Sequence, residues 1–236
     1  MKICIIILAT KKYIEFIPNL SRQIKKYFLP NHQTDIIVFT DNQHKSLDVN
    51  YVLIDHLEFP YMMLLRYRLI YSNSELFKDY DYLYYMDADT QINSLIGEEI
   101  FADYLAVIHP GYFSTPREYF PYEENHHSTA YIGPNHGSKY VCGGFQGGAK
   151  YLEACKILAT NTTTDLKGRI VARWYDESHW NHYCNIVVKP KVLDPSYMWD
   201  LNKGTCPFGP PKIQIIKKDP SFANLNPASV RRGIEF

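Results

Sequence analysis

Apolar residues fall into short unbroken runs that alternate with longer segments of helical spacing. Runs of about four to eight apolar residues between turn-forming residues are typical of strands that are covered on both faces. They predict strands at residues 3–9, 35–40, 51–54, 82–86 and 105–108. Helical spacing predicts helices at 13–28, 61–77, 149–159 and 176–183. This alternation indicates an α/β sheet with the topology of nucleotide-binding folds.

Two segments depart from this alternation. Residues 110–140 are rich in proline and histidine and have little periodicity, and so long an irregular segment in a compact domain is often a binding loop. Residues 217–236 are basic and without clear pattern, so we expect a mobile C-terminal tail. Because no repeat or linker separates the elements, we predict a single catalytic domain over residues 1–236.

Composition narrows the class of protein. The chain has 236 residues, 25 Lys and Arg and 25 Asp and Glu, so it lacks the basic excess of nucleic-acid binders. The apolar run at 3–9 is far shorter than the roughly 20 residues of a membrane span, and no cleavage site follows it. Five cysteines without a C-x-x-C pair indicate reduced thiols. We therefore predict a cytoplasmic protein that binds no nucleic acid and has no membrane span.

Asp87-Ala88-Asp89 is the sharpest local motif. It directly follows a predicted buried strand, at the edge where open α/β sheets bind ligands. Two such carboxylates repel each other unless a cation neutralises them, and oxygen ligands favour Mg²⁺ or Mn²⁺. Alternative interpretations are a solvated acidic turn and a phosphohydrolase with an aspartyl nucleophile. The second fits poorly, because Thr90 comes one position too early.

Two further clusters lie towards the C-terminus. Trp174 precedes the tandem acids Asp176 and Glu177 at the start of a predicted helix. Such acids are often only helix caps, but Glu177 also suits a nucleophile or a stabiliser of an oxocarbenium-like centre. The glycine pairs at 143–144 and 147–148 either let a ligand approach the backbone or form a tight turn from strand to helix.

In order and spacing, these clusters resemble glycosyltransferase family 6, the retaining enzymes that include the histo-blood group A and B transferases and the α-1,3-galactosyltransferases. The resemblance covers essentially the whole chain. Its most specific stretch is Trp174-x-Asp176-Glu177-Ser178-His179. Further matches are Lys11-Lys12-Tyr13, Phe39-Thr40-Asp41, His109-Pro110-Gly111 and Ala130-Tyr131-Ile132.

The resemblance implies a GT-A fold, which is a Rossmann-like mixed sheet flanked by helices. It also implies transfer of GalNAc or galactose from a UDP-sugar to a galactoside acceptor, fucosylated galactosides included, with an α-1,3 linkage and retention. Retention needs a carboxylate either as a covalent nucleophile or as a stabiliser of same-face attack, and the sequence leaves both open. A nucleotidyltransferase, or another UDP-sugar-binding protein on this fold, is the alternative.

Roles for individual residues follow from the resemblance alone. On the donor side, it implies a uracil pocket lined by Leu8, Ala9, Thr10 and Tyr13. Asp87 and Asp89, on either side of Ala88, are implied to hold Mn²⁺ or Mg²⁺ on the diphosphate. Arg231 is implied to close over the diphosphate. Arg66, Asp176 and Glu177 are implied at the donor sugar and the reaction centre. His109, Trp174 and Glu177 are implied at the acceptor.

Donor choice is implied to depend on Cys142, Gly143 and Gly144. Gly144 has no side chain, so we expect room for an acetamido group and a preference for UDP-GalNAc over UDP-galactose. The chain departs from the family pattern at several places, among them the family's second C-terminal basic residue, for which Leu225 stands near the expected position. Tyr175 replaces the usual His after Trp174, and Glu124-Asn125 stands where relatives often carry two arginines.

Overall fold

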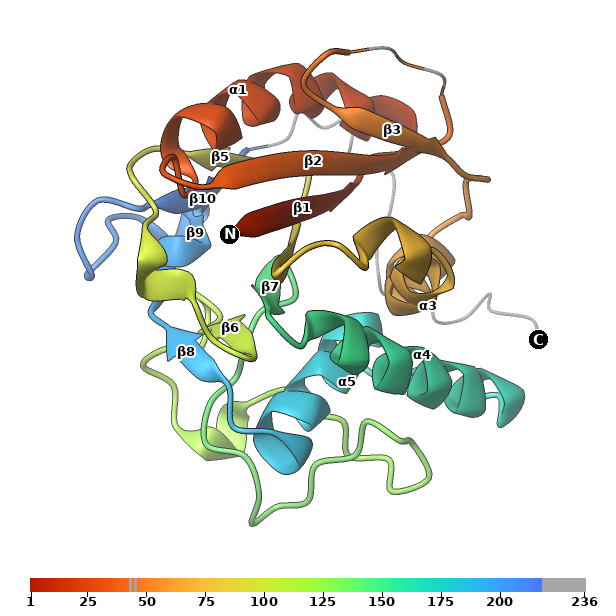
Figure 1. Ribbon diagram of the computed structural model, residues 1–236. Helices are drawn as coiled ribbons and strands as arrows, with labels where there is room; N and C mark the ends of the chain where they lie inside the picture. The colour runs from red at the N-terminus through yellow and green to blue at the C-terminus, as the bar shows by residue number, and fades with distance from the viewer. Residues whose placement is uncertain (43, 45, 218–236) are drawn as a thin grey trace.

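The computed structural model describes residues 1–42, 44 and 46–217 (Figure 1). The C-terminal tail beyond Lys217, and with it Arg231, lies outside the described residues. The predictions of a mobile tail and of a closing arginine are therefore not tested by the structure.

A mixed sheet of seven strands forms the centre, with the order β3-β2-β1-β4-β7-β6-β8. Its strands are β1 (Lys2–Leu8), β2 (Gln33–Thr40), β3 (Asn50–Leu53), β4 (Tyr82–Met86), β6 (Leu105–Val107), β7 (Phe145–Gly148) and β8 (Lys191–Leu193). Strands β3, β2, β1 and β4 run parallel, whereas β7 is antiparallel to both β4 and β6. A smaller sheet joins β5 (Thr90–Ile92), β10 (Ile213–Ile215) and β9 (Trp199–Asp200).

Helices cover both faces of the large sheet (Figure 1). They are α1 (Ile17–Tyr27), α2 (Tyr61–Leu64), α3 (Arg66–Ser72), α4 (Tyr151–Lys167) and α5 (Tyr175–His182). Ile3, Ile5 and Ile7 of β1 pack in the core cluster that contains the buried face of α1. The alternate residues Cys4 and Ile6 pack in the cluster of α3, α4 and α5. This division explains why the first apolar run is unbroken, because each face of the strand meets its own layer of helices.

Shorter helical turns join these elements. They are η1 (Lys11–Phe16), η2 (Ser74–Phe77), η3 (Glu98–Ile100), η4 (Arg117–Tyr119), η5 (Tyr183–Val187), η6 (Pro195–Tyr197) and η7 (Leu201–Lys203). The α/β architecture and the irregular segment at 110–140 are confirmed, with only η4 inside that segment among the named elements. The described cysteines are all free and buried, as expected of reduced thiols.

Some predicted boundaries were wrong. The single helix expected at 61–77 is divided into α2, α3 and η2, and the helix expected at 149–159 extends to Lys167. Gly147 and Gly148 belong to strand β7 instead of a turn, although the turn leading to α4 follows at once.

Strand β7 brings the site together. A side chain on Gly147 would collide with the backbone of Leu83 in β4, and one on Gly148, whose φ is +129°, would collide with the carbonyl of Asp103. Only glycine therefore permits β7 to lie against its neighbours. As a result, the residues just before β7 meet the end of β4, where the Asp87 N–H donates to the Gly144 carbonyl at 2.9 Å.

Candidate functional site

The two acids after β4 differ in their surroundings. The Asp87 carboxylate is partly exposed, accepts a hydrogen bond from the Tyr85 hydroxyl at 2.9 Å and lies 3.5 Å from the Arg66 guanidinium. Asp89 is buried, and its carbonyl accepts a hydrogen bond from the Ile216 N–H at the end of β10. The smaller sheet thus fixes the chain directly after the D-x-D motif.

Arg66 connects the motif with the acidic pair on α5. Its guanidinium forms a buried ion pair with Asp176, and its carbon lies 4.2 Å from the centroid of the Tyr85 ring. Burial acts to lower the pKa of Arg66, but the oxygens of Tyr85, Tyr67 and Asp87 raise it overall. The residue therefore stays charged. Asp176 is fully buried, and its Oδ1 has no hydrogen-bond partner among the described residues.

Glu177 is held beside this pair by hydrogen bonds to both carboxylate oxygens. Oε1 accepts from the Tyr140 hydroxyl at 2.8 Å, and Oε2 accepts from the Gly143 N–H at 2.9 Å. Burial and the nearby Glu177 carboxylate raise the pKa of Tyr140, so its hydroxyl keeps the proton that it donates. Unlike Asp176, Glu177 is only half-buried, and the two hydrogen bonds hold its carboxylate in one orientation.

The predicted acceptor residues lie on the same side as Glu177. His109 contacts the Tyr140 ring at 5.7 Å between centroids, and its Nδ1 accepts from the Gly111 N–H at 2.9 Å. Burial lowers the pKa of His109, so it is a neutral polar group at neutral pH. Trp174, directly before α5, is 37% exposed, and its backbone N–H donates to the Ser178 hydroxyl.

Backbone strain marks the residue between Trp174 and the acidic pair. Tyr175 has a φ of +52°, which is unfavourable for a residue with a large side chain. Its ring is buried and packs edge-on against Phe59 at 5.2 Å between centroids. The tyrosine that departs from the family pattern is thus a packed anchor at the start of α5.

The predicted uracil-pocket residues lie at the carboxyl end of β1, beside the end of β4. The Thr10 hydroxyl lies 3.0 Å from Nδ1 of His56, and the Thr10 carbonyl accepts from the Tyr13 N–H. Lys11 has a φ of +53°, and its N–H donates to the Asp41 carboxylate at 2.8 Å. His56 and Asp41 therefore shape this segment, but sequence reasoning gave them no role. Ala9 and Leu8 lead into it, and Ala9 is fully buried.

The expected empty space beside Gly144 is not present. A side chain at Gly144 would collide with the Met198 methyl group and meet the Asp87 carboxylate at 2.7 Å. One at Gly143 would meet Arg66 at 2.7 Å. Neighbouring side chains of the site thus occupy the room that the glycines provide, and Cys142 next to them is buried. The room expected beside Gly144 thus depends on movement of Met198, and the donor preference stays a prediction.

Asp87 and Asp89 are suited to a divalent cation that is shared with a substrate. Among the residues described, no group of three or more His, Cys, Asp or Glu side chains is arranged to hold a metal ion. Mg²⁺ is commonly held by one or two carboxylates, with phosphate oxygens and water as its remaining ligands. The donor set therefore fits a cation that arrives with a diphosphate.

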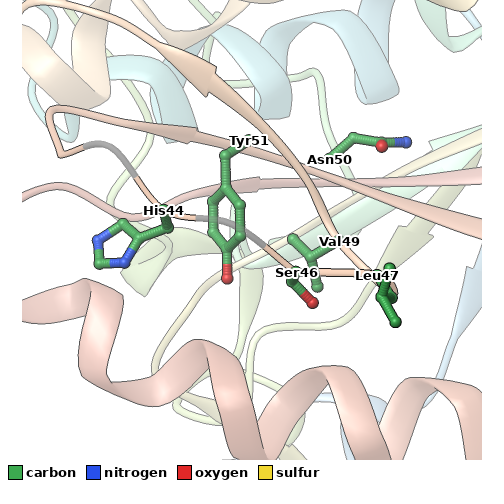
Figure 2. Close-up of a pocket in the computed structure, with 6 residues that line it drawn as sticks. All are labelled: His44, Ser46, Leu47, Val49, Asn50 and Tyr51. Atoms are coloured by element: carbon green, nitrogen blue, oxygen red, sulfur yellow. The ribbon is translucent and has the colours of Figure 1, made fainter.

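A separate surface pocket lies at the far edge of the large sheet (Figure 2). It is lined by His44, Ser46, Leu47, Val49, Asn50 and Tyr51. Strand β3 forms this edge, and β2 and β1 separate it from β4. The pocket is therefore not part of the acidic site.

The mixed sheet and the acidic cluster at the end of β4 define an α/β protein of the GT-A type. The model of Glycosyltransferase family 6 matches residues 1–221, and the chain belongs to this family. In the part of the chain that the structure describes, no helix has the length and apolar character needed to cross a bilayer.

Individual relatives come from animals and bacteria. Globoside alpha-1,3-N-acetylgalactosaminyltransferase 1 of Gallus gallus is 31% identical over 224 residues, which are 89% of this chain and 64% of that protein. Histo-blood group ABO system transferase 1 of Rattus norvegicus is 29% identical over 210 residues, 82% and 60% of the two chains. O-antigen biosynthesis glycosyltransferase WbnI of Escherichia coli is 28% identical over 207 residues, 84% and 88%. The chain thus spans less than two thirds of these animal relatives.

A pH dependence of stability follows from the buried His179 on α5. Burial lowers the pKa of His179 below the usual value of about 6.5. Below that pH the residue is therefore protonated more fully in the unfolded chain than in the folded one. The free energy of unfolding should therefore fall as the pH decreases below about 6.5. His179 contributes at most about 1.4 kcal/mol per pH unit to this fall. Denaturant unfolding of the wild type and His179→Gln between pH 7.5 and 5 measures it.

The variant should show a shallower slope than the wild type over this range. His127→Gln, at an exposed position, is the control and should keep the wild-type slope. Equal slopes for the wild type and His179→Gln would contradict the expectation.

Proposed function

We propose that the protein transfers GalNAc or galactose from a UDP-sugar to a galactoside acceptor, with an α-1,3 linkage and retention. The convergence of Asp87, Asp176 and Glu177 around the buried Arg66 carries this proposal. Such a site offers carboxylates for a metal–diphosphate complex and a separate carboxylate for a cationic sugar centre. The names of the relatives from Gallus gallus and Rattus norvegicus support the class of sugar.

The position of Glu177 favours transfer over the two alternatives. A nucleotidyltransferase needs the D-x-D acids for its phosphates, but it has no use for an oriented carboxylate beside a sugar. A protein that only binds a UDP-sugar needs no charge fixed by a tyrosine and a backbone N–H. A negative charge held in place before the reaction is suited to stabilising positive charge that develops in a transition state.

Transfer is tested by incubating the purified protein with each UDP-sugar, Mn²⁺ and a panel of galactosides that includes fucosylated ones. We expect release of UDP that depends on the acceptor, and a product with an α-1,3 linkage by NMR. UDP-GalNAc should give the higher kcat/KM, by about tenfold, because an additional well-packed group contributes about 1–3 kcal/mol. Absence of transfer with every pair would refute the proposed function.

Gly144→Ala is not a clean test of donor choice. The added methyl group would displace Met198 and press on Asp87, so donor binding as a whole would change. Direct comparison of the two donors on the wild-type protein avoids this difficulty. Met198 is the flexible neighbour that can move to admit an acetamido group.

Metal dependence is expected from the two acids after β4. In Asp89→Asn, transfer should fall at least about a hundredfold, because the cation that neutralises the diphosphate loses a ligand. Titration calorimetry should show weaker UDP binding in Mn²⁺ but equal binding in EDTA. Asp79→Asn, at an exposed position, is the control. Undiminished wild-type transfer in excess EDTA would contradict metal assistance.

Glu177→Gln tests the carboxylate at the reaction centre. The amide keeps the size of the side chain but removes its charge, so turnover should fall by at least about a hundredfold while UDP affinity stays within about twofold. Glu75→Gln, exposed in η2, serves as the control. Near-normal turnover would assign the role to another group, whereas a trapped glycosyl adduct would identify the covalent form of the mechanism.

A further inference from the structure

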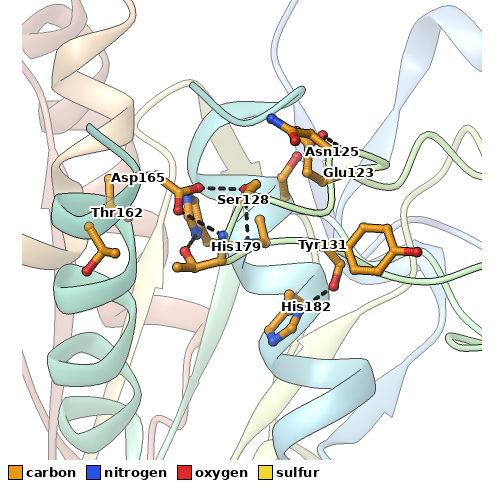
Figure 3. Close-up of polar contacts among 12 residues, drawn as sticks. Glu123, Asn125, Ser128, Tyr131, Thr162, Asp165, His179 and His182 are labelled. Carbon is orange, nitrogen blue, oxygen red and sulfur yellow. Dashed lines mark hydrogen bonds and ion pairs between the residues drawn. The ribbon is translucent and has the colours of Figure 1, made fainter. Parts of the chain in front are cut away.

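Residues 123–131 of the irregular segment lie against α4 and α5 (Figure 3) and belong to no named helix or strand. Their one isolated bridge joins Glu123 with Tyr131. Turn-type hydrogen bonds, such as that from the Ser128 N–H to the Asn125 carbonyl, shape the segment from within, whereas Asp165, His179 and His182 join it to the two helices. Because this segment belongs to the predicted binding loop, whatever fixes it also fixes one wall of the site.

Asp165, in the last turn of α4, provides the first attachment. Its Oδ2 accepts from the Ser128 hydroxyl at 2.5 Å, and its Oδ1 accepts from the Thr129 N–H at 2.8 Å. The Ser128 oxygen in turn accepts from the Ala130 N–H at 3.1 Å. A carboxylate that is 2% exposed would be costly without such partners. One buried carboxylate thereby orders three consecutive residues of the segment.

His179 on α5 meets the same residues from the other side. Its Nε2 lies 3.7 Å from Oδ2 of Asp165, and its Nδ1 lies 3.5 Å from the Thr129 hydroxyl. The imidazole is 1% exposed, and its Nε2 has no hydrogen-bond partner in the described part of the chain. Besides Asp165, the titratable neighbour that acts on the pKa of His179 is His182. Helices α4 and α5 thus enclose Ser128 and Thr129 between a carboxylate and an imidazole.

The same segment is joined to the residues around the reaction centre. Glu123 accepts a hydrogen bond at 2.5 Å from the N–H of Arg173, the residue directly before Trp174. Further along α5, Nδ1 of His182 lies 2.7 Å from the Tyr131 carbonyl. The segment therefore contacts the chain on both sides of Trp174 and Glu177.

We propose that Asp165 and His179 are positioning residues that clamp residues 128–130 between α4 and α5 and so set where the acceptor lies relative to Glu177. This inference rests on the proposed function. Neither residue touches the reacting atoms. Their effect passes through the segment to Arg173 and Trp174, and through α5 to Glu177.

The clamp acts on the acceptor side because the donor side is held by different contacts. Asp87 is fixed by Tyr85 and by the Gly144 carbonyl, and Arg66 is fixed by Asp176. None of these partners lies in residues 123–131. Loosening the clamp should therefore leave the nucleotide site in place while the acceptor wall moves.

Asp165→Asn is the first test. An amide presents both a donor and an acceptor to two hydrogen-bond donors, so one of the contacts with Ser128 or Thr129 is lost. We expect the acceptor KM to rise at least about tenfold, with kcat reduced less than threefold and the UDP dissociation constant unchanged within twofold. Hydrogen exchange of peptides within residues 123–131 should accelerate, while that of β4 does not.

The matched control is Thr162→Val, about one turn earlier on α4. Thr162 is equally buried, but its hydroxyl donates to the Leu158 carbonyl of its own helix. His179→Phe should resemble Asp165→Asn, and His179→Gln, which keeps a polar atom towards Asp165, should recover part of the acceptor affinity. The double variant should be little worse than either single one if the two residues act as a unit.

Two results would overturn the proposal. One is an acceptor KM in Asp165→Asn within twofold of the wild type. The other is equal weakening of UDP and acceptor, with faster exchange in β4, which shows general loosening of the fold. A wild-type protein without transfer would refute the proposed function instead, and the exchange rates would then still decide whether Asp165 holds the segment.

Discussion

Arg66 carries a positive charge into the interior at the point where β4, α3 and α5 meet, and the arrangement of the site depends on it. Asp176 is fully buried, and no other described cation pairs with it. Loss of one partner of a buried ion pair generally costs about 3–5 kcal/mol, because the other charge remains without compensation. The same guanidinium lies near Asp87, so it also reduces the repulsion between the D-x-D motif and the acidic pair. The Arg66 side chain therefore contributes both to the free energy of folding and to the geometry of the candidate site.

The short helix α5 positions the two acids Asp176 and Glu177 relative to Arg66. Asp176 is bound to Arg66, and Glu177, the next residue, is bound to Tyr140 and Gly143. One turn later, Asn181 exchanges two hydrogen bonds with the backbone of Val141. Residues of a single short helix thus hold Arg66, Tyr140 with Gly143, and Val141. A helix of eight residues gains little stability by itself, so these tertiary contacts hold it in place.

The sequence allowed the strands β1, β2 and β4 to be predicted within a residue or two, because each is an unbroken apolar run between two layers of helices. Strand β7 was missed, since Phe145-Gln146-Gly147-Gly148 has no strand-forming pattern and its pairing is set by backbone contact. Asp87, Asp176 and Glu177 were identified from local motifs. Their partners Tyr85 and Tyr140 and the clamp residue Asp165 carry no local signal. Asp165 meets Ser128 across 37 positions, which only the folded chain brings together.

The two glycines of β7 have a consequence for how the enzyme can diversify. A substitution at Gly147 or Gly148 should prevent correct folding, because each added side chain meets the backbone of a neighbouring strand or loop. Such a variant is lost whatever its effect on catalysis would have been. Residues 124–127 are mostly exposed at the surface and have no such restriction. New acceptor preferences should therefore arise by substitution in residues 124–127, whereas the junction of β4 and β7 should stay unchanged. Libraries for altered specificity belong in the segment, with both glycines left unchanged.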